Sequence, residues 1–209
     1  MEKLAKKIAK NIGFSFNYDS EKEAVIAYGL SAIFQMIIIF LVVSVLGLIG
    51  NSWKEGFIIF LFVGLLRRAV GGTHSNTFTG CVIISVFFIS LMAFLSHYLS
   101  NPNLLYVHST FSAIIFIWSF YIVYKKAPVD SPKKRITRPE KIRRLRINSF
   151  ITLTAFLIMV ITVYSYSNVY LRFSGFGIAI TFAVFWQTFM LTKPGHSFIQ
   201  LIDQKLVDF

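Results

Sequence analysis

The chain has little charge, few acidic residues and almost no cysteine. Charged residues make up 14% of its 209 residues, against about 25% in an ordinary soluble domain. Only nine residues are Asp or Glu, so the 21 Lys and Arg residues leave a net charge of +12. The single cysteine, Cys81, excludes an internal disulfide and a multi-cysteine zinc site. A small disulfide-stabilised scaffold is therefore excluded, and the scarcity of charge argues against a soluble enzyme.

Long apolar runs take the place of the missing charge. Hydrophobic residues make up 56% of the chain and include 23 Phe, and the mean hydropathy is +0.67. A helix needs about 20 apolar residues to cross a bilayer. Six segments meet or approach this length, at roughly 24–49, 53–68, 78–99, 104–124, 147–167 and 172–192. We therefore predict an all-α fold, a polytopic transmembrane protein with about six spans, of which the second is short.

The placement of the basic residues predicts the orientation of these spans. If the N-terminus is inside, 19 of the 21 Lys and Arg residues fall on the inner side, and only Lys54 and Arg172 fall outside. Cytoplasmic loops of membrane proteins carry an excess of Lys and Arg. We therefore expect a multi-pass protein of the cell membrane with both termini in the cytoplasm.

The chain divides into three parts on this basis. Residues 1–20 carry Leu4, Ile8 and Ile12 on one helical face with lysines around them, which is typical of an amphipathic arm on an anionic inner leaflet. A disordered basic leader that only sets orientation is the alternative. Residues 21–192 form the transmembrane domain, with polar loops at 67–81 and 125–146. Residues 193–209 are expected to be a cytoplasmic tail, in which His196 is solvated.

Residues 67–81, RRAVGGTHSNTFTGC, form the most polar stretch between two spans. Gly71 and Gly72 are expected to end one helix, and a capping residue should start the next near Thr77 or Thr79. Cys81 then lies in the first turn, where free N–H groups and the helix dipole stabilise a thiolate. His74 in the intervening loop could serve as its base. From this chemistry alone, an inert packed cysteine and a solvated histidine remain the alternative.

The same residues resemble a known family. The pattern R-x4-G-x-H-x6-C, formed by Arg67, Gly72, His74 and Cys81, is followed by a basic loop that opens with Lys125-Lys126-Ala127-Pro128. Together with the span layout over about residues 20–195, this resembles the accessory gene regulator protein B (AgrB) family of Gram-positive quorum sensing. The resemblance implies a membrane cysteine endopeptidase with an active site at the cytoplasmic face.

The resemblance also implies roles for single residues. His74 and Cys81 match the catalytic pair, and Arg67 and Gly72 match supporting positions. A polar residue of the first span falls at about Ser31, a departure from the Gln of a well-known member, and Gln35 lies nearby. From the sequence itself, Asn76 is a candidate to orient His74. Basic side chains of the 125–146 loop could attract an acidic substrate or bind anionic lipid; they are Lys133, Lys134, Arg135, Arg143, Arg144 and Arg146.

The function implied is processing of a small AgrD-like precursor peptide. The enzyme would cleave the C-terminal segment of the precursor, hold the remainder as an acyl-thioester on Cys81, and promote cyclisation to a thiolactone or lactone pheromone. A homodimer is implied, membrane lipids are expected partners, and we expect no cofactor, metal or nucleic acid. A thiol-based acyltransferase is the alternative enzyme. A transporter component is less favoured, because only the first span carries a cluster of polar groups and spans three to six lack a mid-membrane ionisable residue.

Overall fold

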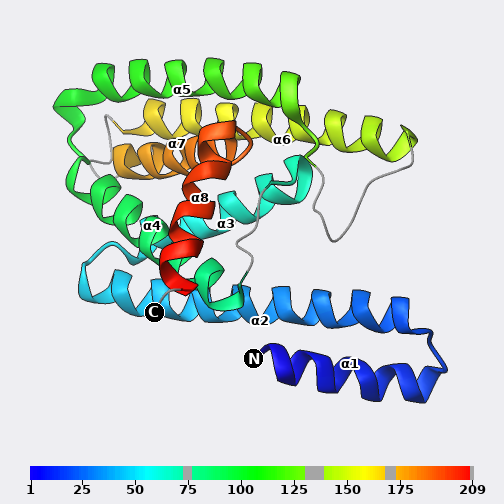
Figure 1. The fold of residues 1–209 in the computed structure, drawn as a ribbon. Helices are drawn as coiled ribbons and strands as arrows, with labels where there is room; N and C mark the ends of the chain where they lie inside the picture. Colours follow the sequence, from blue (N-terminus) through cyan, green and yellow to red (C-terminus); the bar gives the residue numbers. More distant parts are fainter. Residues whose placement is uncertain (73–76, 130–138, 168–172, 208–209) are drawn as a thin grey trace.

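The computed structural model describes residues 1–72, 77–129, 139–167 and 173–207, and helices account for nearly all of this part of the chain (Figure 1). The all-α prediction is confirmed, and a helix covers each of the six predicted spans. The helices are Glu2–Phe16 (α1), Ser20–Ile49 (α2), Trp53–Val70 (α3), Phe78–Tyr98 (α4), the 3₁₀ turn Pro102–Leu104 (η1), Leu105–Lys126 (α5), Pro139–Tyr166 (α6), Phe173–Phe189 (α7) and Lys193–Val207 (α8).

Length and composition identify the helices that can cross a membrane. Helices α2, α4, α5 and α6 are each long and apolar enough, and α7 qualifies together with α8, from which it is bent by 85°. The chain is therefore a multi-pass membrane protein. The segment predicted as the short second span is α3, which has 18 residues and carries Lys54, Glu55, Arg67 and Arg68 near its two ends.

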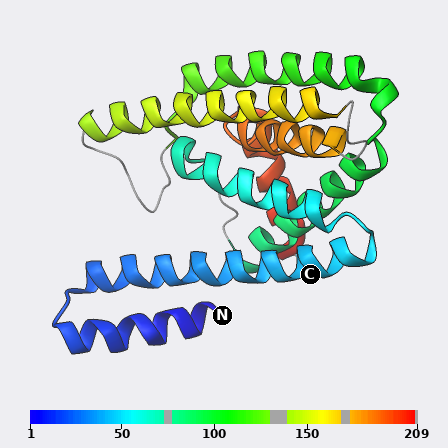
Figure 2. The ribbon, with the colours of Figure 1, turned by 180° about the vertical axis from the view of Figure 1, so that it is seen from behind.

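Helix α3 lies at the centre of the bundle despite this short apolar length. It packs against α7, α6, α4 and α2, and its side chains Ile59, Leu66 and Val70 are fully buried. Helices α5, α6 and α7 lie side by side above it, as both views of the ribbon show (Figures 1 and 2). One face of α3, with Phe57, Leu61 and Leu65, is exposed, and the rest of the helix packs against its neighbours.

Helices α1 and α2 form a hairpin that extends away from the bundle (Figure 2). The sequence predicts an amphipathic helix at residues 1–20, and α1 is that helix. The small residues Ala5, Ala9 and Gly13 form the face that packs against α2, whereas Leu4 is exposed. Helix α2 has 30 residues, which is about 45 Å at 1.5 Å per residue and exceeds the roughly 30 Å hydrocarbon core. Part of this hairpin therefore lies beyond the bilayer core.

Buried hydroxyl groups join α5, α6 and α7 inside the bundle. The Ser112 hydroxyl lies 2.8 Å from the Tyr164 hydroxyl and 2.7 Å from the Thr181 hydroxyl, and Ser119 lies 3.1 Å from Thr188. Sequence reasoning, which considered polar groups within single spans, did not foresee this cluster, because its side chains are scattered along three helices and meet only in the fold. They bond to one another, as interhelical polar groups in membranes commonly do.

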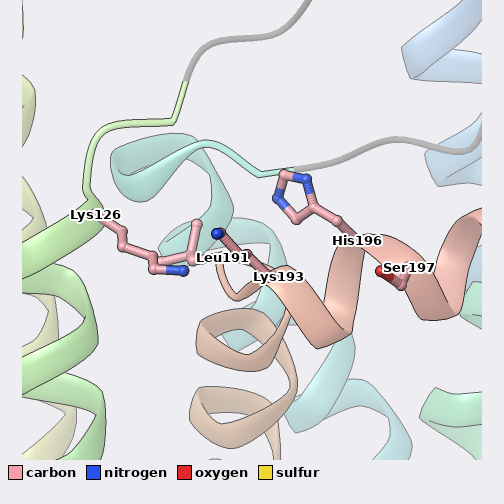
Figure 3. A pocket seen from close by; sticks show the side chains of 5 residues that line it. All are labelled: Lys126, Leu191, Lys193, His196 and Ser197. Atoms are coloured by element: carbon pink, nitrogen blue, oxygen red, sulfur yellow. The ribbon is translucent and has the colours of Figure 1, made fainter.

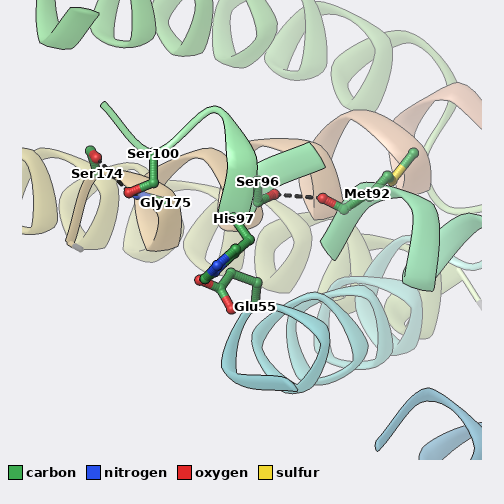
Figure 4. Close-up of polar contacts among 7 residues, drawn as sticks. All are labelled: Glu55, Met92, Ser96, His97, Ser100, Ser174 and Gly175. Carbon is green, nitrogen blue, oxygen red and sulfur yellow. Dashed lines mark hydrogen bonds and ion pairs between the residues drawn. The ribbon is translucent and has the colours of Figure 1, made fainter. Parts of the chain in front are cut away.

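A second group of polar contacts lies at the end of the bundle where α3 and α7 begin and α4 ends (Figure 4). The buried Glu55 carboxylate lies 3.2 Å from Nδ1 of His97. The Ser100 hydroxyl lies 3.0 Å from that of Ser174 and accepts a hydrogen bond from the Gly175 N–H at 3.2 Å. These contacts hold together the ends of α3, α4 and α7 that lie away from Cys81.

The segment expected to be a solvated tail is helical. Helix α8 begins at Lys193, directly after the turn that ends α7, and its Ile199 is buried. The Phe198 ring packs edge-on against Phe88 of α4, with centroids 5.5 Å apart. The expectation that His196 is solvated was wrong, because this turn folds α8 back onto the bundle and leaves His196 only partly exposed.

The packing of Gly177 gives a direct test of the helix contacts. A Cβ atom at this position would overlap the ring of Tyr164. We expect Gly177→Ala to displace that ring and its bond to Ser112, and to lower the stability by about 1–3 kcal/mol, as overpacking does. The thermal unfolding midpoint of the detergent-solubilised protein measures this loss.

Gly64 provides the matched control, because a Cβ atom there would meet nothing within 4 Å. Gly64→Ala should leave the midpoint unchanged or raise it, since glycine costs about 0.5–1 kcal/mol relative to alanine in a helix. Equal midpoints for the two variants would contradict the close packing of α7 against α6.

Candidate functional site

Cys81 lies at the end of the first turn of α4, as the sequence predicts. Thr77 is the N-cap residue, and its side-chain oxygen accepts a hydrogen bond from the Gly80 N–H at 3.0 Å. The Cys81 N–H then donates to the Thr77 carbonyl at 3.2 Å. The residue is 9% exposed. The cap therefore fixes Cys81 close to the N-terminus of α4.

Arg67 lies in the last turn of α3. Its guanidinium is partly buried and interacts electrostatically with Cys81 and with Tyr28 of α2. Arg68, the next residue, is exposed. The two arginines therefore differ in surroundings: Arg67 belongs to the cysteine site, and Arg68 points to the outside of the bundle.

Helix α2 contributes an amide to the same site. The side-chain nitrogen of Gln35 donates to the carbonyl of Phe78, the first residue of α4, at 3.4 Å. Ser31 lies one turn earlier in α2 and is partly buried. The sequence predicts a polar residue of the first span at Ser31 or Gln35, and the structure brings the Gln35 side chain to the start of the helix that carries Cys81.

Two glycines turn the chain out of α3 toward the predicted His74 loop. Gly71 has φ 75° and Gly72 has φ 137°, a region that side chains other than glycine rarely adopt. The Val129 N–H donates to the Val70 carbonyl at 3.0 Å, and a Cβ atom at Gly71 would overlap the Val129 carbonyl oxygen. The beginning of the basic loop therefore packs directly on the glycine turn, which explains why no larger residue fits at Gly71.

Gln187 of α7 holds this turn from the other side. Its side-chain nitrogen donates to the Gly71 carbonyl at 2.7 Å, and Gln187 is 2% exposed. A Cβ atom at Gly72 would lie 3.2 Å from the same nitrogen and 3.9 Å from Leu191 Cδ2. Sequence reasoning missed Gln187, although an amide within an otherwise apolar span is a signal that could have found it.

Several predicted site residues lie outside the part of the chain that the structure describes. They are His74, Asn76, Lys133, Lys134 and Arg135.

The other basic residues of the predicted loop lie on α6. Arg143 and Arg144 are exposed in its first turns. Arg146 donates to the Tyr124 carbonyl at 3.0 Å and stacks over the Tyr124 ring. Arg146 therefore joins α6 to the end of α5, which is a structural contact, while its neighbours remain open to solvent or lipid.

The described residues thus place a thiol, a guanidinium and a helix N-terminus together. Helices α2, α3, α4 and α7 all contribute to this arrangement, and the segment that carries His74 runs directly between Gly72 and Thr77. Among the described residues, no group of three or more His, Cys, Asp or Glu side chains could hold a metal ion. The groups present suit nucleophilic chemistry by a thiol.

Comparisons with known proteins identify the family of the chain. The family profile described as accessory gene regulator B matches residues 1–191. The chain is 32% identical over 212 aligned positions to "Putative AgrB-like protein 2" of Clostridium perfringens strain 13, and 29% identical over 207 to "Putative AgrB-like protein" of strain SM101. Each alignment covers 97% of this chain and 96% of the relative. No solved structure matches the chain. With a profile match over nearly its whole length, the chain belongs to the accessory gene regulator B family.

Proposed function

We propose that this protein is a membrane cysteine endopeptidase that processes a small AgrD-like precursor peptide. One observation carries the proposal: Cys81 lies in a capped first turn and interacts electrostatically with the Arg67 guanidinium. In the sequence, His74 lies seven residues before Cys81. The enzyme cleaves the C-terminal segment from the precursor. The remainder is closed into a cyclic thiolactone or lactone peptide for quorum sensing.

Cleavage begins with proton transfer from the Cys81 thiol to the His74 imidazole. The thiolate attacks the carbonyl carbon of the scissile peptide bond, and negative charge develops on its oxygen. The N–H groups of Phe78 and Thr79 are available to this oxygen, because the first residues of a helix lack intrahelical acceptors. The C–N bond then breaks, and His74 returns the proton to the departing amine. An acyl-thioester on Cys81 remains.

Ring closure follows from the thioester. A thiol or hydroxyl of the bound precursor attacks the thioester carbonyl, the bond to the Cys81 sulfur breaks, and the proton passes through His74 to Cys81. Exchange of one thioester for another is nearly thermoneutral, so water is the main competitor. The low exposure of Cys81 supports this step, since a site that excludes water protects reactive intermediates.

The glycine turn begins the segment that carries the proposed base. His74 follows Gly72 by two residues in the sequence, so we propose that the conformation of this turn influences the position of the imidazole. The hydrogen bond from Gln187 to the Gly71 carbonyl holds this turn. We therefore assign Gln187 as a positioning residue that acts through His74.

The site is proposed to face the cytoplasm. The ends of α3 and α5 and the start of α6 carry Arg67, Arg68, Lys125, Lys126, Lys141, Arg143, Arg144 and Arg146. Among the described helices, Lys54 lies at the opposite end of α3. The excess of Lys and Arg in cytoplasmic loops supports this orientation. A precursor made in the cytoplasm then reaches Cys81 without crossing the membrane.

Substitution of the dyad tests the proposed function. Cys81→Ala and His74→Ala should each reduce precursor cleavage by at least about 10³-fold, because the nucleophile and its base act as a unit. Cys81→Ser should also be nearly inactive, since a hydroxyl has a much higher pKa than a thiol. The measurement is mass spectrometry of the released C-terminal segment and of the acyl species on Cys81, with purified protein and precursor in vesicles.

Ser85→Ala is the control for these variants, because Ser85 lies one turn beyond Cys81 in α4 and is partly buried like its neighbours. It should cleave at the rate of the unmodified protein. Normal cleavage by Cys81→Ala would exclude the peptidase assignment.

The role of Gln187 predicts a specific kinetic defect. Gln187→Leu leaves the Gly71 carbonyl without its donor while keeping a buried side chain of similar size. A lost hydrogen bond of about 1–1.5 kcal/mol should lower kcat about tenfold. KM should change little, because Gln187 is buried behind the glycine turn and is not expected to contact the substrate. Single-turnover cleavage assays in vesicles separate the two constants.

Thr188→Val is the matched control, since Thr188 is the neighbouring buried residue and bonds to Ser119 rather than to the glycine turn. It should lower the thermal midpoint with an unchanged kcat. An equal loss of kcat in both variants would mean that Gln187 affects catalysis only by stabilising the packing of α7, and would contradict its positioning role.

The orientation has its own test. In a Cys81→Ala background, single cysteines at residues 51 and 101 should react with a membrane-impermeant maleimide added outside intact cells. A cysteine at residue 141, in the first turn of α6, should react only after the cells are opened. Labelling of residue 141 from outside would invert the topology and the placement of the active site.

A further inference from the structure

A cavity lies beside the candidate site, where α5 ends and α7 turns into α8 (Figure 3). Its volume is about 300 Å³, and Lys126, Leu191, Lys193, His196 and Ser197 line it. This volume is at the lower end of the range for small-ligand sites. Leu191 also contacts the position where Gly72 would carry a Cβ atom, at 3.9 Å. The cavity therefore shares a wall with the turn that leads to His74.

Positive charge converges on this cavity. Lys126 reaches in from the end of α5 and Lys193 from the start of α8, with Leu191 between them (Figure 3). The described residues that line the cavity include no acidic side chain. Lys193 also begins α8, so the positive end of that helix dipole adds to the field. Two ammonium groups and a helix N-terminus therefore face one space and give it a positive potential that attracts an anion.

His196 adds a hydrogen-bond donor to this wall. Its Nε2 atom is buried and has no hydrogen-bond partner within the described part of the chain. Burial and the charge of Lys126 hold the pKa of His196 below its usual value. A buried polar atom without a partner is unfavourable, and an anionic oxygen would satisfy it.

The position of the cavity indicates the source of the anion. Lys126 ends α5, a helix long and apolar enough to span the membrane, and α8 leaves α7 at 85°. If α7 crosses the bilayer, α8 runs nearly along its plane, at the level of the lipid headgroups. Leu191 offers an apolar wall next to the two ammonium groups. A molecule with a phosphate and an apolar body can contact both the two lysines and Leu191. A soluble anion would contact the lysines alone.

We infer that this cavity binds the phosphate of an anionic phospholipid headgroup. Lys126 and Lys193 neutralise its charge, the His196 N–H and the Ser197 hydroxyl donate to its oxygens, and Leu191 packs against its glycerol. This site goes beyond the proposed peptidase function and does not depend on it. Since Leu191 also supports Gly72, an occupied site stabilises the turn that leads to His74.

Lipid binding by the purified full-length protein tests this inference. Native mass spectrometry should detect retained phosphatidylglycerol in preference to phosphatidylcholine, and phosphatidylglycerol should raise the thermal midpoint more than phosphatidylcholine does. Lys126→Gln and Lys193→Gln should each weaken phosphatidylglycerol retention about fivefold, since a basic residue near an anionic lipid surface contributes about a factor of five.

Lys125→Gln is the matched control, because Lys125 adjoins Lys126 but instead donates to the Tyr121 hydroxyl at 2.9 Å. It should retain phosphatidylglycerol as the unmodified protein does. Equal loss in Lys125→Gln, or equal retention of the two lipids, would overturn the site. Thermal stabilisation by inorganic phosphate alone, or by a polyglutamate peptide but not by phosphatidylglycerol, would assign the cavity to a soluble anion and overturn the lipid.

Discussion

The hydrogen bond from Gln187 to the Gly71 carbonyl is the contact that ties α7 to the turn at the end of α3. A carbonyl at the end of a helix lacks an intrahelical donor, and in a bundle surrounded by lipid little water is available to satisfy it. The donor must therefore come from another helix. Gln187 of α7 supplies this donor. The turn after α3 is therefore held by α7 and by Val129, which follows α5.

This constraint explains why two glycines occupy the turn. The Val129 backbone leaves no room for a Cβ atom at Gly71, and at Gly72, which has a φ of 137°, a Cβ atom would lie 3.2 Å from the Gln187 side-chain nitrogen. Glycine usually costs stability in a helix because it is flexible. Here close backbone contacts restrict that flexibility, so the turn is a defined element between α3 and α4.

Much of the fold could be predicted from the sequence, because its signals are local. Hydropathy located the six apolar segments, and the capping residue Thr77 located the start of α4 and hence Cys81 in its first turn. The family pattern identified Arg67 and Gly72, whose positions beside Cys81 and Gln187 have a structural reason. Each of these inferences needs only neighbouring residues in the chain.

The remaining features depend on contacts between distant segments. Gln187 is separated from Gly71 by 116 residues, and the hydroxyl groups of Ser112, Tyr164 and Thr181 lie on three helices. In each case a single polar residue in an apolar span gives no indication of its partner. Helix α8 escaped prediction because Pro194 and Gly195 usually signal a chain break; here they lie in its first turn instead.

The turn from α7 into α8 connects these features. Gln187 and Leu191 lie one turn apart and both face the glycines, while Leu191 and Lys193 also line the neighbouring cavity. Lys126 and Val129, on the other side, belong to the short segment that packs on Gly71. A displacement of α8 therefore moves the wall of the cavity and the support of the glycine turn together. The Phe198 ring of α8 contacts Phe88 of α4 and Phe189 of α7. Helix α8 is therefore held against α4, the helix that carries Cys81, and against α7, the helix that carries Gln187.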